Sequence, residues 1–178
     1  MVRLYFSTLS RRLSVERQER TTQQPAVPDR DGCNPAYLAY APGMTLGSQG
    51  AVIDEAGRIL LVRHSYRAGW FFPGGGVEWG ETLEEALARE LEEEVGVTLT
   101  GPPVLHGMFS NNANFAGDHI ALYLVRQWTR DGDYRQKGEI SQTGMFALDD
   151  LPEPLDPGTS RRLAEIFDGA PVSPKWSG

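Results

Sequence analysis

The sequence of 178 residues has one cysteine, no long apolar run and no excess of basic residues. The single thiol, Cys33, cannot form an internal disulfide, so nothing in the chain indicates an oxidising compartment. The apolar runs are too short for secretion or for spanning a membrane. The 17 Lys and Arg stand against 24 Asp and Glu, whereas nonspecific nucleic-acid binding depends on basic patches. We therefore predict a cytoplasmic protein that binds neither nucleic acid nor membranes.

The excess of acidic residues is confined to one segment, residues 75–97. This segment contains eight Glu and one Arg, so it carries the same net charge of −7 as the whole chain. The rest of the chain balances to zero. A charge-dependent site is therefore expected in this segment.

The same segment has the pattern of a glycine-rich loop followed by a helix. Gly74–Gly76 precede Thr82 and Glu85, which have the Thr-x-x-Glu spacing of a capping box. Gly96 supplies a C-terminal stop. At about 100° per residue, Glu90 and Glu94 share one helix face with apolar residues, namely Leu83, Leu87 and Leu91.

Carboxylates among core leucines are costly to ionise unless a compensating charge lies nearby. Glu90, Glu93 and Glu94 stand at i, i+3 and i+4, so their side chains are expected to meet on the helix surface. Such a group suits Mg²⁺ or Mn²⁺, which take oxygen ligands and complete their shell with water and phosphate. The alternative is a solvated Glu-rich face, which charge runs commonly form.

The spacing of the segment favours the metal site. It reads Gly75, five residues, Glu81, seven residues, Arg89-Glu90-Leu91, one residue, Glu93-Glu94, one residue and Gly96-Val97. Every fixed position of the Nudix box is filled, and the chain resembles the Nudix hydrolases. The resemblance includes the flanking residues 70–76 and 146–152 and extends over residues 45–167.

The resemblance implies hydrolysis of a nucleoside diphosphate linked to another group. In such enzymes divalent metal polarises phosphoryl oxygens and lowers the pKa of a bound water, and a carboxylate removes the proton. It implies that Glu90, Glu93, Glu94 and the carbonyl of Gly75 hold Mg²⁺ or Mn²⁺. It also implies a general base, for which Glu93 and Glu90 are alternatives.

Three further acidic residues and one arginine are candidates for the same site. Glu81 and Arg89 are expected to form a supporting ion pair that keeps the loop and the helix in register. The alternative is a weak surface pair. Glu139, in the loop before the last strand, is our candidate for an additional metal-binding or base carboxylate, with Asp118 in reserve. A solvated loop acid is the alternative.

Residues next to the box are candidates for substrate binding. Arg63 and Arg67 precede the glycine loop and could reach a phosphate, although solubilising positions at a strand edge would look the same. Gly74 and Gly75 would allow close approach of the backbone to phosphates or metal.

The predicted substrate is a small nucleotide, with a nucleoside di- or triphosphate favoured. Relatives that cleave ADP-ribose usually place a proline about fifteen residues after the box, and none occurs here between Pro103 and Pro152. The absence of this proline makes ADP-ribose less favoured than a nucleoside di- or triphosphate. ADP-ribose and nucleotide sugars are kept as alternative substrates. A non-catalytic ligand-sensing module is a further alternative, although such modules generally have decayed boxes.

The length and the hydrophobic content of 40% predict a single core. Apolar runs predict strands over residues 51–53, 59–62, 104–109 and 120–125, and a second helix is expected over 160–167. This order predicts an α/β fold, a Nudix-type α/β/α sandwich around a mixed β-sheet.

The predicted domain covers residues 44–170. Residues 1–43, rich in Arg and Pro, are expected to form a loosely packed extension, with an organellar presequence as the alternative. Residues 171–178 are expected to form a C-terminal tail. Met44 is a candidate for the biological start. A homodimer is a candidate for the oligomeric state.

Overall fold

A mixed sheet is the centre of the part of the chain that the computed structural model describes, residues 43–132, 134 and 138–177. Its strands are β1 (Thr45–Val52), β3 (Gly74–Gly76), β5 (Val104–Ser110) and β6 (Asp118–Val125). They lie in the order β3-β1-β6-β5. β1 and β6 run parallel, whereas β3 and β5 are antiparallel to their neighbours.

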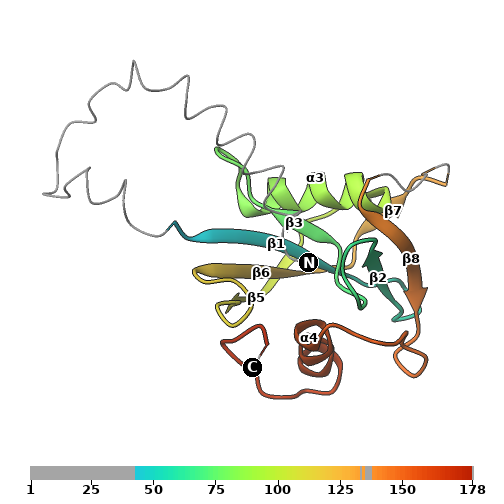
Figure 1. The fold of residues 1–178 in the computed structure, drawn as a ribbon. Helices are drawn as coiled ribbons and strands as arrows, with labels where there is room; N and C mark the ends of the chain where they lie inside the picture. The colour runs from blue at the N-terminus through green and yellow to red at the C-terminus, as the bar shows by residue number, and fades with distance from the viewer. Residues whose placement is uncertain (1–42, 133, 135–137, 178) are drawn as a thin grey trace, which may run out of the picture. The chain divides into compact units, whose positions relative to one another are not determined.

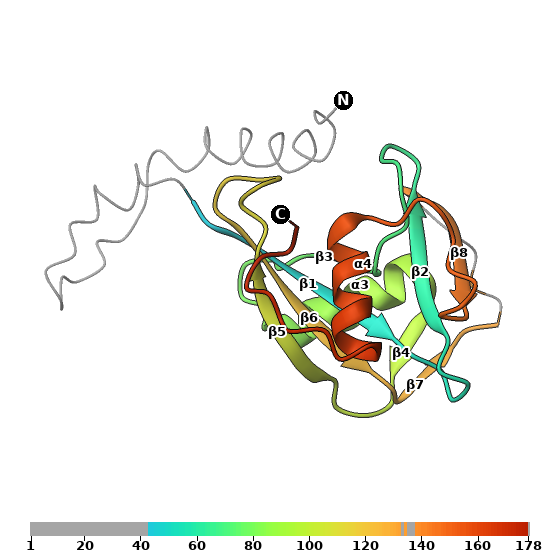
Figure 2. The ribbon, with the colours of Figure 1, turned by 90° about the horizontal axis from the view of Figure 1, so that it is seen from below.

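Two shorter sheets adjoin this one. β2 (Ile59–His64) pairs antiparallel with β8 (Ile140–Phe146), and β4 (Val97–Leu99) pairs antiparallel with β7 (Trp128–Arg130). In Figure 2, β2 and β8 lie side by side. The four strands predicted from apolar runs all lie within observed strands or extend them by one residue.

One helix covers each face of the mixed sheet, with α3 (Leu83–Val95) on one side and α4 (Pro157–Phe167) on the other (Figure 1). Alternate residues of β6 serve the two cores, as expected for a strand buried on both faces. The α3-side core contains Ala121, Tyr123 and Val125 with Leu87 and Leu91. The α4-side core contains Ile120 and Leu122 with Leu163 and Trp176. The predicted α/β/α sandwich around a mixed sheet is confirmed.

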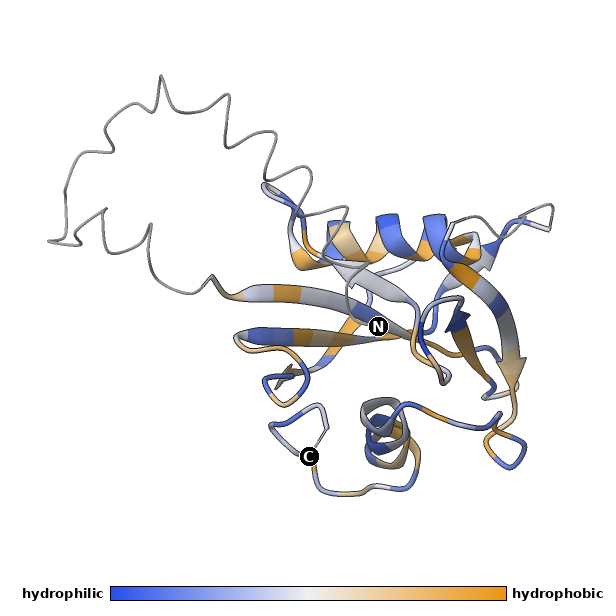
Figure 3. Cartoon of the chain, viewed as in Figure 1, coloured by the Kyte–Doolittle hydropathy of each residue, from blue (hydrophilic) through white to orange (hydrophobic). Residues whose placement is uncertain are grey.

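The predicted ends of α3 are confirmed as well. The Thr82 hydroxyl accepts a hydrogen bond from the Glu85 amide, and the Glu85 carboxylate accepts one from the Thr82 amide. Gly96 ends the helix at φ 65°, a conformation that glycine adopts without strain. The apolar side of α3 faces the sheet (Figure 3).

Helix α4 begins three residues before the predicted start at residue 160. Asp156 is its N-cap and accepts a hydrogen bond from the Thr159 amide, while Pro157 occupies the first turn. Proline is suited to that position because its missing N–H would have no partner there. The cap and the proline together explain the earlier start.

The C-terminal segment packs against the domain. Trp176 is only 3% exposed and belongs to the α4-side core. Residues 43–178 form a compact unit of their own. Residues 1–42 of the predicted extension, including Cys33, lie outside the described residues. The predicted domain boundaries stay predictions. None of the described helices is long and apolar enough to cross a membrane.

Candidate active site

Glu94 is a partly buried carboxylate at the junction of α3 and the glycine loop. Its Oε2 atom accepts a hydrogen bond from the Gly74 amide at 2.8 Å. Burial raises the pKa of Glu94 to about 8, and the negative charges of Glu90, Glu139 and Glu93 add to the increase. Several carboxylates therefore lie close together in a partly buried environment, which disfavours their ionised forms.

Glu90 lies one helical turn before Glu94 and has a side chain that is 16% exposed. Arg89 Nη1 donates to its Oε1 at 2.7 Å, yet burial outweighs this contact and raises the pKa of Glu90. Gly75 packs directly on this carboxylate, because a Cβ atom at Gly75 would overlap its oxygens. The loop can come this close to the helix only with glycine at this position.

Glu93 is more exposed than Glu90, and its charge raises the pKa of both Glu90 and Glu94. Its side chain is 64% exposed, and its Oε2 lies 3.7 Å from Arg89 Nη1. Within the described residues, no three His, Cys, Asp or Glu side chains gather closely enough to form a ready-made metal cluster. Arg89 and the Gly74 amide hold Glu90 and Glu94 by hydrogen bonds, while the Glu93 side chain is mostly exposed, and the three-carboxylate metal site stays a prediction.

The structure brings Glu81 and Arg89 together, as the resemblance to the Nudix box implies. Arg89 donates from Nε to Glu81 Oε1 at 2.7 Å and from Nη2 to Oε2 at 2.9 Å. Nη2 also donates to the Gly76 carbonyl at 3.0 Å. The hydrogen bonds from Arg89, followed by the one from the Glu78 amide, lower the pKa of Glu81 to about 2. This fork ties the helix to the glycine loop at two points.

The two loop acids have different surroundings. Glu139 lies near enough to Glu94 for its charge to raise the pKa of that residue, and its carbonyl accepts a hydrogen bond from the Ser65 amide at 2.8 Å. The Asp118 carboxylate instead accepts hydrogen bonds from Thr45 Oγ1 and Asn111 Nδ2. Of the two predicted acids, Glu139 thus lies near Glu94, whereas Asp118 forms hydrogen bonds at the start of β6.

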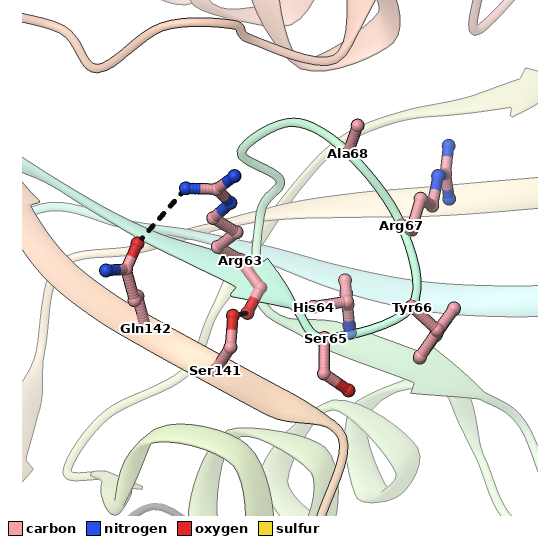
Figure 4. Close-up of a pocket in the computed structure, with 8 residues that line it drawn as sticks. All are labelled: Arg63, His64, Ser65, Tyr66, Arg67, Ala68, Ser141 and Gln142. Carbon is pink, nitrogen blue, oxygen red and sulfur yellow. Dashed lines mark hydrogen bonds between the residues drawn. The ribbon is translucent and has the colours of Figure 1, made fainter.

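A pocket of about 580 Å³ contains both predicted substrate-binding arginines, Arg63 and Arg67. Figure 4 shows the loop from Arg63 to Ala68 curving around it, with Ser141 and Gln142 of β8 alongside. Arg63 Nη1 donates to Gln142 Oε1 at 3.4 Å, and the Ser141 hydroxyl donates to the Arg63 carbonyl at 2.9 Å. Two guanidinium groups and several hydroxyls make the pocket suited to an anion.

Five lining residues of this pocket were not considered as binding residues, namely Ser65, Tyr66, Ala68, Ser141 and Gln142. The signal that could have found the last two is the pairing of β8 with β2, which sets Gln142 opposite Arg63. His64 also lines the pocket. Burial lowers the pKa of His64 to about 4, and the nearby charge of Arg67 adds to the decrease.

The residues around α3 fit a divalent cation. Gly75 leaves room for its backbone beside the Glu90 carboxylate, and Glu94 is surrounded by other carboxylate charges. Among the described residues, Arg89 is the arginine that pairs with these carboxylates, and it is shared between Glu81 and Glu90. A hard cation with oxygen ligands would offset the remaining negative charge.

Comparison with known proteins identifies the family of the chain. Residues 46–166 match the family model described as NUDIX domain. A MutT-like protein of Streptomyces ambofaciens is 30% identical over 136 residues, which make up 76% of this chain and 85% of that protein. The 8-oxo-dGTP diphosphatase of Escherichia coli (strain K12) is 36% identical over 118 residues, 61% of this chain and 88% of that protein. The crystal structure of a MutT NUDIX hydrolase from Burkholderia pseudomallei superposes with a TM-score of 0.60 at 33% identity, covering 71% of this chain and 100% of the other.

Proposed function

This chain belongs to the NUDIX domain family, and from that premise we propose that it hydrolyses a nucleoside di- or triphosphate with the help of Mg²⁺ or Mn²⁺. It is a pyrophosphohydrolase that acts on acid anhydrides in nucleotide-like substrates. The single observation that carries the proposal is the group of carboxylates around the glycine loop, of which Glu94 has a pKa raised to about 8. We also expect the enzyme to be cytoplasmic.

Glu90, Glu94 and the Gly75 carbonyl would hold the cation, with Glu93 as a further ligand. A divalent cation there would polarise the phosphoryl oxygens and lower the pKa of a bound water. Glu81 and Arg89 would keep the ligands in place, because their hydrogen-bonded fork joins α3 to the Gly76 carbonyl.

The general base is Glu93 or Glu90, and the contacts of the two residues favour Glu93. The Oε1 atom of Glu90 already accepts a short hydrogen bond from Arg89, so this carboxylate has fewer free lone pairs for an attacking water. Glu93 is 64% exposed and meets Arg89 only at 3.7 Å, so its carboxylate can contact an attacking water. Glu139, whose charge acts on Glu94, is the remaining candidate for a base or an additional ligand.

Arg63 and Arg67 would bind the phosphates of the substrate. Both line the anion-suited pocket, and the loop that carries them is tied to Glu139 through the Ser65 amide. The Gly74 and Gly75 backbone would also approach the phosphates or the metal. Positioning and charge neutralisation are the main requirements of phosphoryl transfer, and these residues supply both.

The relative in Escherichia coli is an 8-oxo-dGTP diphosphatase, which supports a nucleoside triphosphate as the first substrate to test. The test is release of phosphate or pyrophosphate from a panel of nucleoside triphosphates, including 8-oxo-dGTP, with ADP-ribose and nucleotide sugars alongside. Each substrate is assayed with Mg²⁺, with Mn²⁺ and with a chelator, and Glu93→Gln is run in parallel.

Cleavage of a nucleoside triphosphate that needs metal and is lost in Glu93→Gln is the expected result. Preferential cleavage of ADP-ribose or a nucleotide sugar would replace the proposed substrate and leave the chemistry in place. Binding of nucleotides without cleavage of any of them would contradict the proposal and indicate a ligand-sensing module.

A further inference from the structure

Arg67 is held in a defined orientation in the pocket although its side chain is 43% exposed. Its Nη2 atom donates to Asp156 Oδ1 at 3.2 Å. Its guanidinium carbon also lies 4.1 Å from the centre of the Phe71 ring. An exposed arginine on a loop ordinarily samples many rotamers, so these two contacts decide where its charge is presented.

Asp156 is a buried residue with several donors around one carboxylate. Its Oδ2 accepts from the Thr159 amide at 3.0 Å and from Trp176 Nε1 at 3.3 Å, which leaves Oδ1 to Arg67. The carboxylate thus connects the first turn of α4, the C-terminal segment and the pocket loop. Removing the indole donor would leave Oδ2 held by Thr159 alone and weaken the restraint that keeps Oδ1 toward Arg67.

Trp176 is fixed from several sides. Its amide donates to the Ser110 carbonyl at 2.9 Å, and its ring lies edge-on to Phe109 with centroids 6.0 Å apart. Gly158 makes room for the indole, because a Cβ atom at that position would overlap Nε1. The indole N–H is therefore aimed at Asp156 by packing that does not involve the pocket.

We propose that Trp176 and Asp156 are positioning residues for substrate binding, which act by fixing the guanidinium of Arg67 in the pocket. The C-terminal segment thereby sets the affinity for the substrate phosphates from behind the pocket. This inference rests on the proposed function, in which Arg67 binds a phosphate of the nucleotide.

The first test is Trp176→Phe, which keeps an aromatic ring in the core but removes the indole N–H together with part of the buried ring volume. We expect KM for dGTP or 8-oxo-dGTP in Mg²⁺ to rise about three- to tenfold, the range that corresponds to immobilising one long side chain at binding. The value of kcat should change less than twofold, because the carboxylates of α3 are untouched. Leu163→Val is the matched control, since it loosens the same core without a contact to Asp156, and its KM should equal that of the wild type.

A double-mutant cycle separates positioning from general destabilisation. In an Arg67→Gln background, Trp176→Phe should have no further effect on KM, because the side chain it positions is gone. An unchanged KM in Trp176→Phe, or an equal rise in both backgrounds, would overturn the proposal. Asp156→Asn provides a second route if Trp176→Phe folds poorly, with the same expectation of no added effect in the Arg67→Gln background.

A spectroscopic measurement tests the positioning without relying on turnover. The side-chain ¹⁵N signals of Arg67, assigned by their loss in Arg67→Gln, should be observable in the wild type and broadened or shifted in Trp176→Phe. Identical Arg67 signals in both proteins would overturn the positioning role even if hydrolysis is confirmed. Conversely, altered signals with no hydrolysis of any nucleotide would reject the proposed function and leave the coupling of Trp176 to Arg67 standing.

Discussion

The two helices each hold an arginine among carboxylates, but the two clusters differ in exposure and in charge balance. On α3, Arg89 is 25% exposed and lies near three carboxylates, those of Glu81, Glu90 and Glu93. On α4, Arg162 is fully buried and pairs with one carboxylate, that of Glu165, which is also fully buried.

The difference follows from what each environment allows. A buried charge is tolerated when a partner neutralises it, and the Arg162–Glu165 pair meets this condition one to one. Glu165 also accepts from the Ser173 amide and lies 3.2 Å from His106 Nε2. Around α3 the negative charge exceeds the positive, so that cluster retains the capacity to bind a cation. We infer that the α3 cluster serves catalysis and the α4 cluster serves stability.

The strongest way to break this contrast is Glu93→Gln on α3. Because Glu93 is a proposed ligand and base, kcat should fall by about 10²- to 10⁴-fold. The melting temperature should stay the same, since the side chain is mostly exposed. Steady-state kinetics and thermal unfolding check both statements. Glu92→Gln, at the neighbouring exposed position, is the control, and a comparable loss of kcat there would refute a specific role of Glu93.

The corresponding change on α4 should affect stability and leave kcat nearly unchanged. Arg162→Met removes the partner of a fully buried carboxylate, so the free energy of unfolding in urea should decrease by about 3–5 kcal/mol. Arg58→Met breaks an ion pair in which the arginine is 52% exposed and should cost less than about 1 kcal/mol. Equal decreases in the free energy of unfolding of the two variants would show that the buried pair stabilises the fold no more than the exposed pair does.

Arg89→Lys sharpens the comparison by keeping the charge of the α3 cluster and removing its geometry. A lysine cannot donate to both Glu81 oxygens and to the Gly76 carbonyl from one planar group. The affinity for Mn²⁺ should fall about 10- to 100-fold, as for other residues that orient metal ligands. Arg126→Lys, at an exposed position, provides the control. An unchanged Mn²⁺ affinity in Arg89→Lys would show that a positive charge at position 89 is sufficient and that the planar guanidinium is not needed.

The smallest expected effect concerns His64, beside Phe71 of the α3-side core. Burial lowers its pKa to about 4, whereas an unfolded histidine titrates near 6.5. Above pH 6.5 both states are neutral, and between 6.5 and 4 only the unfolded chain takes up the proton, so acid favours unfolding. The wild type should therefore lose about 2 kcal/mol more stability than His64→Gln between pH 7 and 4.5. Parallel pH dependences in urea unfolding would contradict the lowered pKa.

Local sequence patterns predicted the elements that depend on local interactions. The capping box at Thr82 and the stop at Gly96 define α3, and the resemblance to the Nudix box implied the ion pair of Glu81 and Arg89. These features need only the chain within one helix and the loop before it. The four strands with apolar runs were found for the same reason, because their periodicity is local.

Features that depend on distant partners were not predicted. The helical wheel gives the angle of Glu93 on α3 but not its surroundings, in which the side chain is 64% exposed and lies 3.7 Å from Arg89 Nη1. Ser141 and Gln142 enter the pocket through pairing of β8 with β2. Trp176 follows no periodic pattern, and its burial requires the space that Gly158 leaves beside it.

The most direct test of the central claim is a calorimetric titration of Mn²⁺ into the wild type and into a Glu90→Gln, Glu94→Gln double variant. Both substitutions keep the side-chain shape and a hydrogen-bond acceptor for Arg89 and the Gly74 amide. The account predicts a saturable Mn²⁺ site in the wild type and at least a 100-fold weaker one in the double variant. Equal Mn²⁺ binding by the two proteins would contradict the assignment of the α3 carboxylates as the metal site.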